Sequence, residues 1–77
     1  MKVNVFGIWE EVKSYKEASE KVREFCYVNG FGASMWYSVK GTGLIEENGK
    51  INSHVSYNGR VWEGADDNIV PRKEIVF

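Results

Sequence analysis

One group of residues in this sequence has the types that acid–base or nucleophilic chemistry needs: Asn52, His54, Ser56 and Glu63. A carboxylate can orient an imidazole and raise its basicity, and the imidazole can in turn activate a serine hydroxyl. The predicted strand register places these side chains on one face of an open sheet, which has neither an oxyanion hole nor walls that exclude water. We therefore interpret the group as a solvated cross-strand cluster, and we expect no catalytic residues and no enzyme activity.

Few residues of the chain suit a metal or a cofactor. Cys26 is the only cysteine and His54 the only histidine, whereas a closed zinc site needs four such ligands. Acidic pairs occur at 10–11, 46–47 and 66–67. Neighbouring side chains of a strand point to opposite faces, so the two carboxylates of such a pair diverge. We expect neither a metal nor a cofactor.

Length and charge narrow the function classes further. The chain has 77 residues, with 10 Lys and Arg against 11 Asp and Glu and a formal net charge of −1. A chain of this length buries about 60% of its unfolded surface. This gives a single domain over 1–77 with one small core, and it leaves no room for a large catalytic cleft. The near-neutral charge also argues against a general affinity for phosphate backbones.

The cysteine and the N-terminus indicate a location. Cys26 cannot form an intramolecular disulfide, although secreted domains of this size usually depend on disulfides. No apolar run approaches the roughly 20 residues that a membrane span needs, and the N-terminus lacks a signal-peptide pattern. We expect a cytoplasmic protein that does not enter a membrane.

A capping box marks the start of a helix. In this motif the Ser14 hydroxyl accepts from the Glu17 backbone N–H, while the Glu17 carboxylate reaches back. Apolar side chains then recur at helical spacing, opposite a charged face: Tyr15, Ala18, Val22, Phe25 and Cys26. Gly30 suits the left-handed residue that ends a helix. The pattern predicts an amphipathic helix over about 15–28.

Two Asn-Gly dipeptides, at 48–49 and 58–59, predict tight hairpin turns. Asn-Gly suits the two-residue type I′ turn because both central residues need positive φ. The segments between these turns read as a three-stranded antiparallel meander over 42–64. The overall prediction is an α+β fold, in which one amphipathic helix packs on a twisted antiparallel sheet of four or five strands.

Two-residue turns also predict which side chains face the helix. They pair Val55 with Trp62 and His54 with Glu63, and alternation then divides the side chains between two faces. The face predicted to pack against the helix contains Leu44, Ile51, Val55, Tyr57 and Trp62. The face predicted to meet solvent or a partner contains Lys50, Asn52, His54, Ser56 and Glu63, with Ile45 and Val61.

Three segments fit two structures each. Residues 2–13 suit either a type II′ hairpin with Gly7-Ile8 as the turn or one strand bulged at Gly7. Residues 33–39 are β-prone in composition but also suit a short helical turn. Residues 72–77 suit either a last edge strand or a docked tail.

Aromatic residues make up 14% of the chain, more than so small a core can enclose. Exposed Tyr and Trp beside an Arg are typical of protein-binding hot spots. We therefore predict contacts with a protein partner by Trp9, Tyr37, Tyr57 and Arg60, with packing inside the fold as the alternative for each. An uncapped edge strand and spare aromatic residues would also suit a homodimer.

A nucleic acid is the alternative partner, because three-stranded sheets can enter DNA grooves and aromatic rings can stack on bases. The candidate contacts are Lys40, Lys50, Asn52 and Arg60. The predicted sheet also carries Glu46, Glu47 and Glu63, which would repel phosphate. Protein binding is therefore the leading prediction.

Three segments spread along the chain are SYKEASEKVREF at 14–25, GASMWY at 32–37 and VSYNGRVW at 55–62. They resemble small proteins of bacteriophages and mobile elements in low-GC Gram-positive bacteria. The resemblance brings no catalytic motif and no functional residue. Small phage proteins without active sites commonly bind and block a host machine, including restriction and CRISPR nucleases. By this analogy of setting, the resemblance implies an inhibitor of a host enzyme or defence nuclease in the bacterial cytoplasm.

Overall fold

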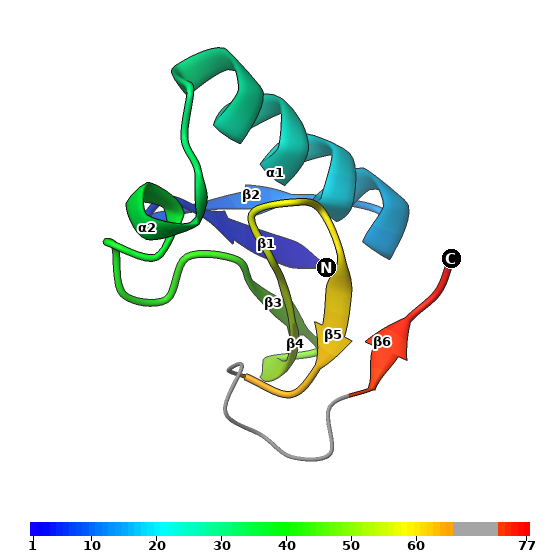
Figure 1. Ribbon diagram of the computed structural model, residues 1–77. Coiled ribbons are helices and arrows are strands. Elements are labelled where there is room, and N and C mark those ends of the chain that lie inside the picture. The colour runs from blue at the N-terminus through cyan, green and yellow to red at the C-terminus, as the bar shows by residue number, and fades with distance from the viewer. Residues whose placement is uncertain (66–72) are drawn as a thin grey trace.

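The computed structural model describes residues 1–65 and 73–77. In this part of the chain, helix α1 (Tyr15–Asn29) lies across a six-stranded antiparallel sheet (Figure 1). The strands are β1 (Lys2–Val5), β2 (Ile8–Glu11), β3 (Leu44–Glu47), β4 (Lys50–Val55), β5 (Val61–Glu63) and β6 (Glu74–Ile75). Their order is β2-β1-β3-β4-β5-β6, so β2 and β6 are the edges. The predicted α+β class is confirmed, although the sheet has more strands than the predicted four or five.

Helix α1 begins at the predicted capping box. The Ser14 hydroxyl accepts a hydrogen bond from the Glu17 N–H at 3.1 Å. At the other end Gly30 is left-handed, with φ 68°, and its N–H donates to the Tyr27 carbonyl. Local sequence therefore determines both ends of this helix, and the observed bounds differ from the predicted 15–28 by one residue.

The N-terminal residues form a hairpin and not one bulged strand. Val5 lies opposite Ile8, so the turn is Phe6-Gly7 and not the predicted Gly7-Ile8. Both turn residues have positive φ, 52° and 96°, as a type I′ turn requires. Phe6 is an unusual residue in this conformation, and its ring packs 5.6 Å from that of Phe25 and 5.1 Å from that of Phe31. These aromatic contacts offset the cost of the turn.

The β3–β4 hairpin has the predicted turn at Asn48-Gly49, with φ 54° and 79°. A β-bulge between Ile45 and Glu46 then shifts the register, so that Ile45 pairs with Ser53 and not with Asn52. A shift of one residue moves side chains to the opposite face of a strand pair. Ile45 is fully buried for this reason, and its predicted place on the solvent-facing side was wrong.

The turn between β4 and β5 is longer than predicted. Of the Asn58-Gly59 pair only the glycine has positive φ, at 85°. The Ser56 N–H donates to the Arg60 carbonyl, so the loop contains three residues, 57–59. Loops of this length combine a type I turn with a left-handed glycine. Val55 consequently pairs with Val61 and not with Trp62.

These two differences redistribute the faces of the sheet. The side that packs against α1 contains the buried residues Val3, Val5, Ile45, Ser53, Val55 and Val61. Val55 was predicted there, whereas Ile51 and Tyr57, also predicted there, are 39% and 40% exposed. His54 was predicted to meet solvent or a partner. It lies on the predicted face, opposite α1, but it is buried there, and its Nδ1 lies 2.9 Å from the Gly64 carbonyl oxygen.

The remaining two open segments also have definite structures. Residues 33–39 contain the short helix α2 (Ala33–Trp36) and no strand. Trp36 is fully buried, and its ring lies 6.2 Å from that of Phe25. In the C-terminal segment Ile75 of β6 pairs with Val61, so this segment extends the sheet. Residue 72 of the predicted 72–77 segment lies outside the described residues.

Candidate protein-binding surface

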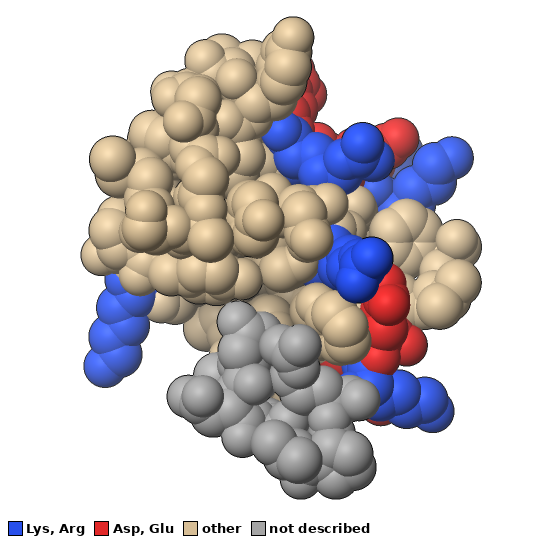
Figure 2. All heavy atoms as spheres, in the orientation of Figure 1, with Lys and Arg blue, Asp and Glu red and all other residues tan. Residues whose placement is uncertain are grey.

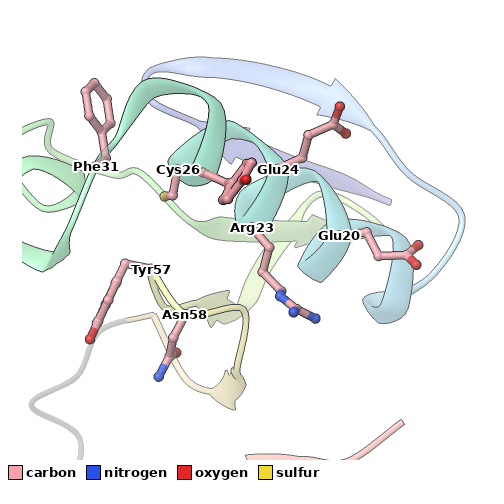
Figure 3. A pocket seen from close by; sticks show the side chains of 8 residues that line it. Glu20, Arg23, Glu24, Cys26, Phe31, Tyr57 and Asn58 are labelled. Atoms are coloured by element: carbon pink, nitrogen blue, oxygen red, sulfur yellow. The ribbon is translucent and has the colours of Figure 1, made fainter.

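A groove of about 470 Å³ lies between α1 and the β4–β5 turn (Figure 3). Tyr57 and Asn58 form its wall on the side of the turn. The other lining residues come from α1 and the segment that follows it: Glu20, Arg23, Glu24, Cys26, Tyr27 and Phe31. We call this surface the helix–turn groove. It combines three aromatic side chains with charged groups.

A buried hydrogen bond attaches the turn to the helix. The Ser19 hydroxyl donates to the Gly59 carbonyl at 2.6 Å, and Ser19 is 4% exposed. Gly59 also allows the close approach of Arg23, because a Cβ at this position would overlap the aliphatic part of that side chain. The two walls of the groove are therefore held at a defined separation.

The aromatic side chains of the groove differ in exposure. Tyr27 on α1 is 88% exposed and Tyr57 on the turn is 40% exposed. Phe31 is half-buried and packs with Phe6 and Phe25, at ring distances of 5.1 and 5.6 Å. The groove thus has an aromatic base that belongs to the core and a tyrosine on each wall. Such rings provide large contact areas at a low cost in conformational entropy.

Charged groups surround this aromatic surface. In Figure 3 the Arg23 side chain extends from α1 toward the turn, whereas the carboxylates of Glu20 and Glu24 point away from it. Figure 2 shows that uncharged side chains cover this face over the C-terminal end of α1. Charged side chains gather instead beside β5, β6 and the first turns of α1. The helix–turn groove lies where this uncharged surface meets the charged one.

A second hollow, of about 340 Å³, continues from the groove toward β6. It shares Glu20, Arg23 and Asn58 with the groove. Three cations line it, Lys16, Arg23 and Arg60, together with Glu20 and Glu74 and the apolar residues 75–77. Arg60 therefore extends the same continuous surface on which Tyr57 lies.

The thiol of Cys26 in the groove wall does not supply a nucleophile. Cys26 is 5% exposed, and burial raises the pKa of its thiol. A raised pKa keeps the group protonated, whereas the thiolate is the form that attacks or binds metals. Within residues 1–65 and 73–77, no group of three or more His, Cys, Asp or Glu side chains could hold a metal ion. The acidic pair 66–67 lies outside these residues.

The structure also separates the residues first considered for acid–base chemistry. His54 pairs with Trp62 across the strands, and Glu63 pairs with Ser53, so the predicted pairing of His54 with Glu63 does not occur. Glu63 shares a face with its partner Ser53, and Ser53 and His54 are neighbours on β4, whose side chains alternate between the two faces. Glu63 therefore lies on the opposite face of the sheet from His54. The carboxylate is not placed to orient the imidazole.

Of the predicted partner contacts, only Tyr57 and Arg60 lie together. Trp9 is 41% exposed on edge strand β2, and four strand spacings separate it from β5. This amounts to roughly 19 Å along the sheet. Tyr37 is 44% exposed at the end of α2 and does not line the groove. The four residues therefore do not make one contact surface.

The predicted nucleic-acid contacts are also spread apart. Lys50 begins β4, whereas Arg60 follows the other end of that strand, roughly 17 Å away along the strand. The Asn52 amide donates to the Glu47 carboxylate at 3.3 Å. Lys40 lies in the segment between α2 and β3.

Sequence reasoning missed the helix wall of the groove. Tyr27 and Phe31 were not singled out, and Arg23 was counted only as part of the charged face of the helix. One signal was present: Tyr27 and Val28 are apolar but lie off the apolar stripe of the helix, so both project into solvent, 88% and 73% exposed.

Comparison with known proteins adds no assignment. A scan against protein-family models and searches of curated proteins and of solved structures found no match to this chain. In the part of the chain that the structure describes, neither helix has the length and apolar character to cross a membrane.

Proposed function

We propose that the protein is a small non-enzymatic binding module that recognises another protein through the helix–turn groove. The observation that carries this proposal is the pair of exposed tyrosines, Tyr27 and Tyr57, on the two walls of one groove that also contains Arg23. Tyrosine and arginine are the residue types enriched at binding hot spots. Because the walls are held together by the Ser19 hydrogen bond, partner binding needs little rearrangement.

The partner that we propose is an enzyme of a bacterial host, a defence nuclease included. The resemblance to small phage proteins supports this class. An inhibitor of this kind acts by covering a surface of its target, so it needs a rigid, complementary patch and no reactive groups of its own. The bacterial cytoplasm is the compartment in which such a target is met.

Nucleic-acid binding by the meander remains the second candidate from the sequence, and the geometry favours it less. Of the cations proposed for it, Lys50 and Arg60 lie toward opposite ends of β4, and Lys40 lies in the segment between α2 and β3. Glu46 and Glu47 belong to β3 and lie beside the β3–β4 turn, where they would repel phosphate.

A photo-cross-linking amino acid at position 27 tests the proposal directly. Tyr27 is 88% exposed, so its replacement leaves the core intact. In lysate of a low-GC Gram-positive bacterium, we expect one dominant protein adduct that survives nuclease treatment and is lost in a Tyr57→Ala background. The matched control places the same group at exposed Lys50, where we expect no such adduct.

Three outcomes would count against the proposal. An adduct that nuclease treatment removes would support nucleic-acid binding. An adduct of twice the mass of the chain would show a homodimer at this surface. Equal adducts from positions 27 and 50 would show that the groove has no special affinity.

A further inference from the structure

The edge strand β2 has an outer side to which no strand is paired. Next to a two-residue turn, the closing pair exchanges two backbone hydrogen bonds, and every second pair repeats this. The closing pair here is Val5 and Ile8, so Ile8 and Glu10 bond to β1. Trp9 and Glu11 then direct their backbone N–H and C=O groups away from β1. Within the described residues β2 pairs only with β1, and this outer side has no backbone partner.

Neither lysine nor proline protects the outer side of β2. Ile8 is 69% exposed and Trp9 is 41% exposed. Native proteins usually protect an edge strand with charged side chains, above all lysines, or with proline, a bulge, a covering loop or a very short strand. The carboxylates of Glu10 and Glu11 are the only charges on β2, and Glu10 is partly neutralised by Lys21, whose Nζ lies 3.5 Å from it.

The neighbouring helix leaves space beside this edge. A hollow of about 270 Å³ lies between β2 and the C-terminal half of α1. Phe25 and Val28 supply its apolar lining, and Val28 is 73% exposed. The polar groups at its border are those of Glu10, Lys21, Glu24 and Asn29. A strand added to β2 would place alternate side chains on the α1 side, next to Ile8 and into this hollow. The other side chains would lie beside Trp9 and Glu11.

We propose that β2 accepts an added strand from a partner protein, one that alternates small apolar residues on the α1 side with basic residues beside Trp9 and Glu11. The backbone pairing supplies affinity and the alternate side chains supply specificity. A lysine in this position is opposite in charge to Glu11 and can also lie over the Trp9 ring. The site is separate from the helix–turn groove and does not depend on it.

The charges of β2 favour such a partner over a second copy of this chain. A two-fold antiparallel pairing of β2 with itself joins outward residues to outward residues, so each register has Trp9 or Glu11 opposite Trp9 or Glu11 of the second copy. Every register brings four carboxylates into one short ladder. The register that pairs Trp9 with Glu11 also places the two Glu10 opposite each other, and the register centred on Glu11 places the two Glu11 opposite each other. Like charges in these positions destabilise strand pairs.

The probe for this site is a synthetic capped heptapeptide, TVKVKVT, which reads the same in both directions and so fits either strand orientation. Amide hydrogen exchange of the full-length protein is followed by NMR. We expect the peptide to slow exchange at Trp9 and Glu11, with little change at Ile8 and Glu10, which already bond to β1. The peptide TVEVEVT should bind at least about fivefold more weakly.

Two variants make the test specific. Glu11→Lys changes an exposed side chain and should reverse the preference between the two peptides. Trp9→Pro removes an outward N–H that β1 does not use and should abolish protection, whereas Trp9→Thr keeps this N–H and should retain protection at Glu11. Tyr57→Ala should leave peptide binding unchanged, which separates this site from the groove.

The proposal would be overturned by any of three results. One is unchanged exchange at Trp9 and Glu11 under a large excess of the lysine peptide. Another is equal binding of the two peptides by the wild-type protein. The last is a Glu11→Lys variant that binds both peptides as the wild type does. If the free protein sedimented as a dimer and the Trp9→Pro variant as a monomer, the edge strand would be assigned to pairing with a second copy instead.

Discussion

At the residue scale, Gly43 connects two strands that are distant in sequence. Its N–H donates to the Asn4 carbonyl at 2.6 Å, and its own carbonyl accepts from the Val55 N–H at 2.8 Å. Its φ is 87°, and a Cβ here would overlap the backbone carbonyl oxygen of Val55. Backbone atoms cannot move aside as the end of a flexible side chain can.

We therefore predict that Gly43→Ala lowers the free energy of unfolding by at least about 3 kcal/mol. Gly49→Ala is the matched control, because Gly49 has a similar φ of 79° but open space where the Cβ would be. Its cost should be only about 1 kcal/mol. Urea denaturation measures both, and equal losses would show that the overlap at Gly43 is unimportant.

The Cys26 thiol gives the protein a specific pH dependence. Because burial raises the pKa of this thiol, the folded protein keeps the proton when the unfolded chain has begun to lose it. This contribution to stability is fully present below the ordinary thiol pKa of about 8.5 and is lost as pH rises above it. We predict that the wild type loses more stability than Cys26→Ala between about pH 7.5 and about pH 9.5. Urea midpoints at the two pH values measure the difference, and parallel losses would contradict it.

At the element scale, the turns show how far local sequence determines this fold. The capping box at Ser14 and the Asn48-Gly49 turn were predicted, because each depends on residues a few positions apart. The predicted Asn58-Gly59 turn is one residue shorter than the observed loop, which contains residues 57–59. Its actual form includes contacts that are distant in sequence, above all the hydrogen bond from Ser19 to Gly59.

The candidate site was predicted less completely than the fold. Tyr57 and Arg60 were identified because they flank a turn that the sequence shows plainly. Tyr27 was missed because only the packing of α1 against the turn makes it part of a groove. The predicted assignment of Ile45 to the solvent-facing side of the sheet was wrong for a similar reason. The β-bulge at Ile45 does not change the hydrophobic alternation of the sequence, so the sequence pattern does not reveal it.

The Ser19 hydrogen bond provides a prediction at the scale of the elements it joins. Ser19→Ala leaves the Gly59 carbonyl without this buried partner, and we expect a loss of about 1–2 kcal/mol in the free energy of unfolding. Ser38→Ala is the matched control. The Ser38 hydroxyl also donates to a carbonyl at 2.6 Å, that of Met35, but this bond is local and exposed. Its loss should change stability by less than about 0.5 kcal/mol, and equal losses would contradict the structural role of Ser19.

At the scale of the whole molecule, the sheet separates two surfaces that differ in the way they can bind. The helix–turn groove lies beside the β4–β5 turn and offers side chains, mainly aromatic. The outer side of β2 lies at the other edge of the sheet and offers backbone groups. In a protein with a radius of gyration of 11.2 Å, both surfaces are close enough for one large partner to cover.

The affinity of the protein for the partner captured at position 27 tests the central claim most directly. Calorimetry would compare Tyr57→Ala with Tyr37→Ala, because the two tyrosines are similarly exposed, 40% and 44%, and only Tyr57 lines the helix–turn groove. We predict that Tyr57→Ala weakens binding at least about tenfold and that Tyr37→Ala changes it by less than about twofold. An unchanged affinity of the Tyr57→Ala variant for this partner, or a larger loss of affinity in Tyr37→Ala than in Tyr57→Ala, would contradict the assignment of the groove as the partner-binding surface.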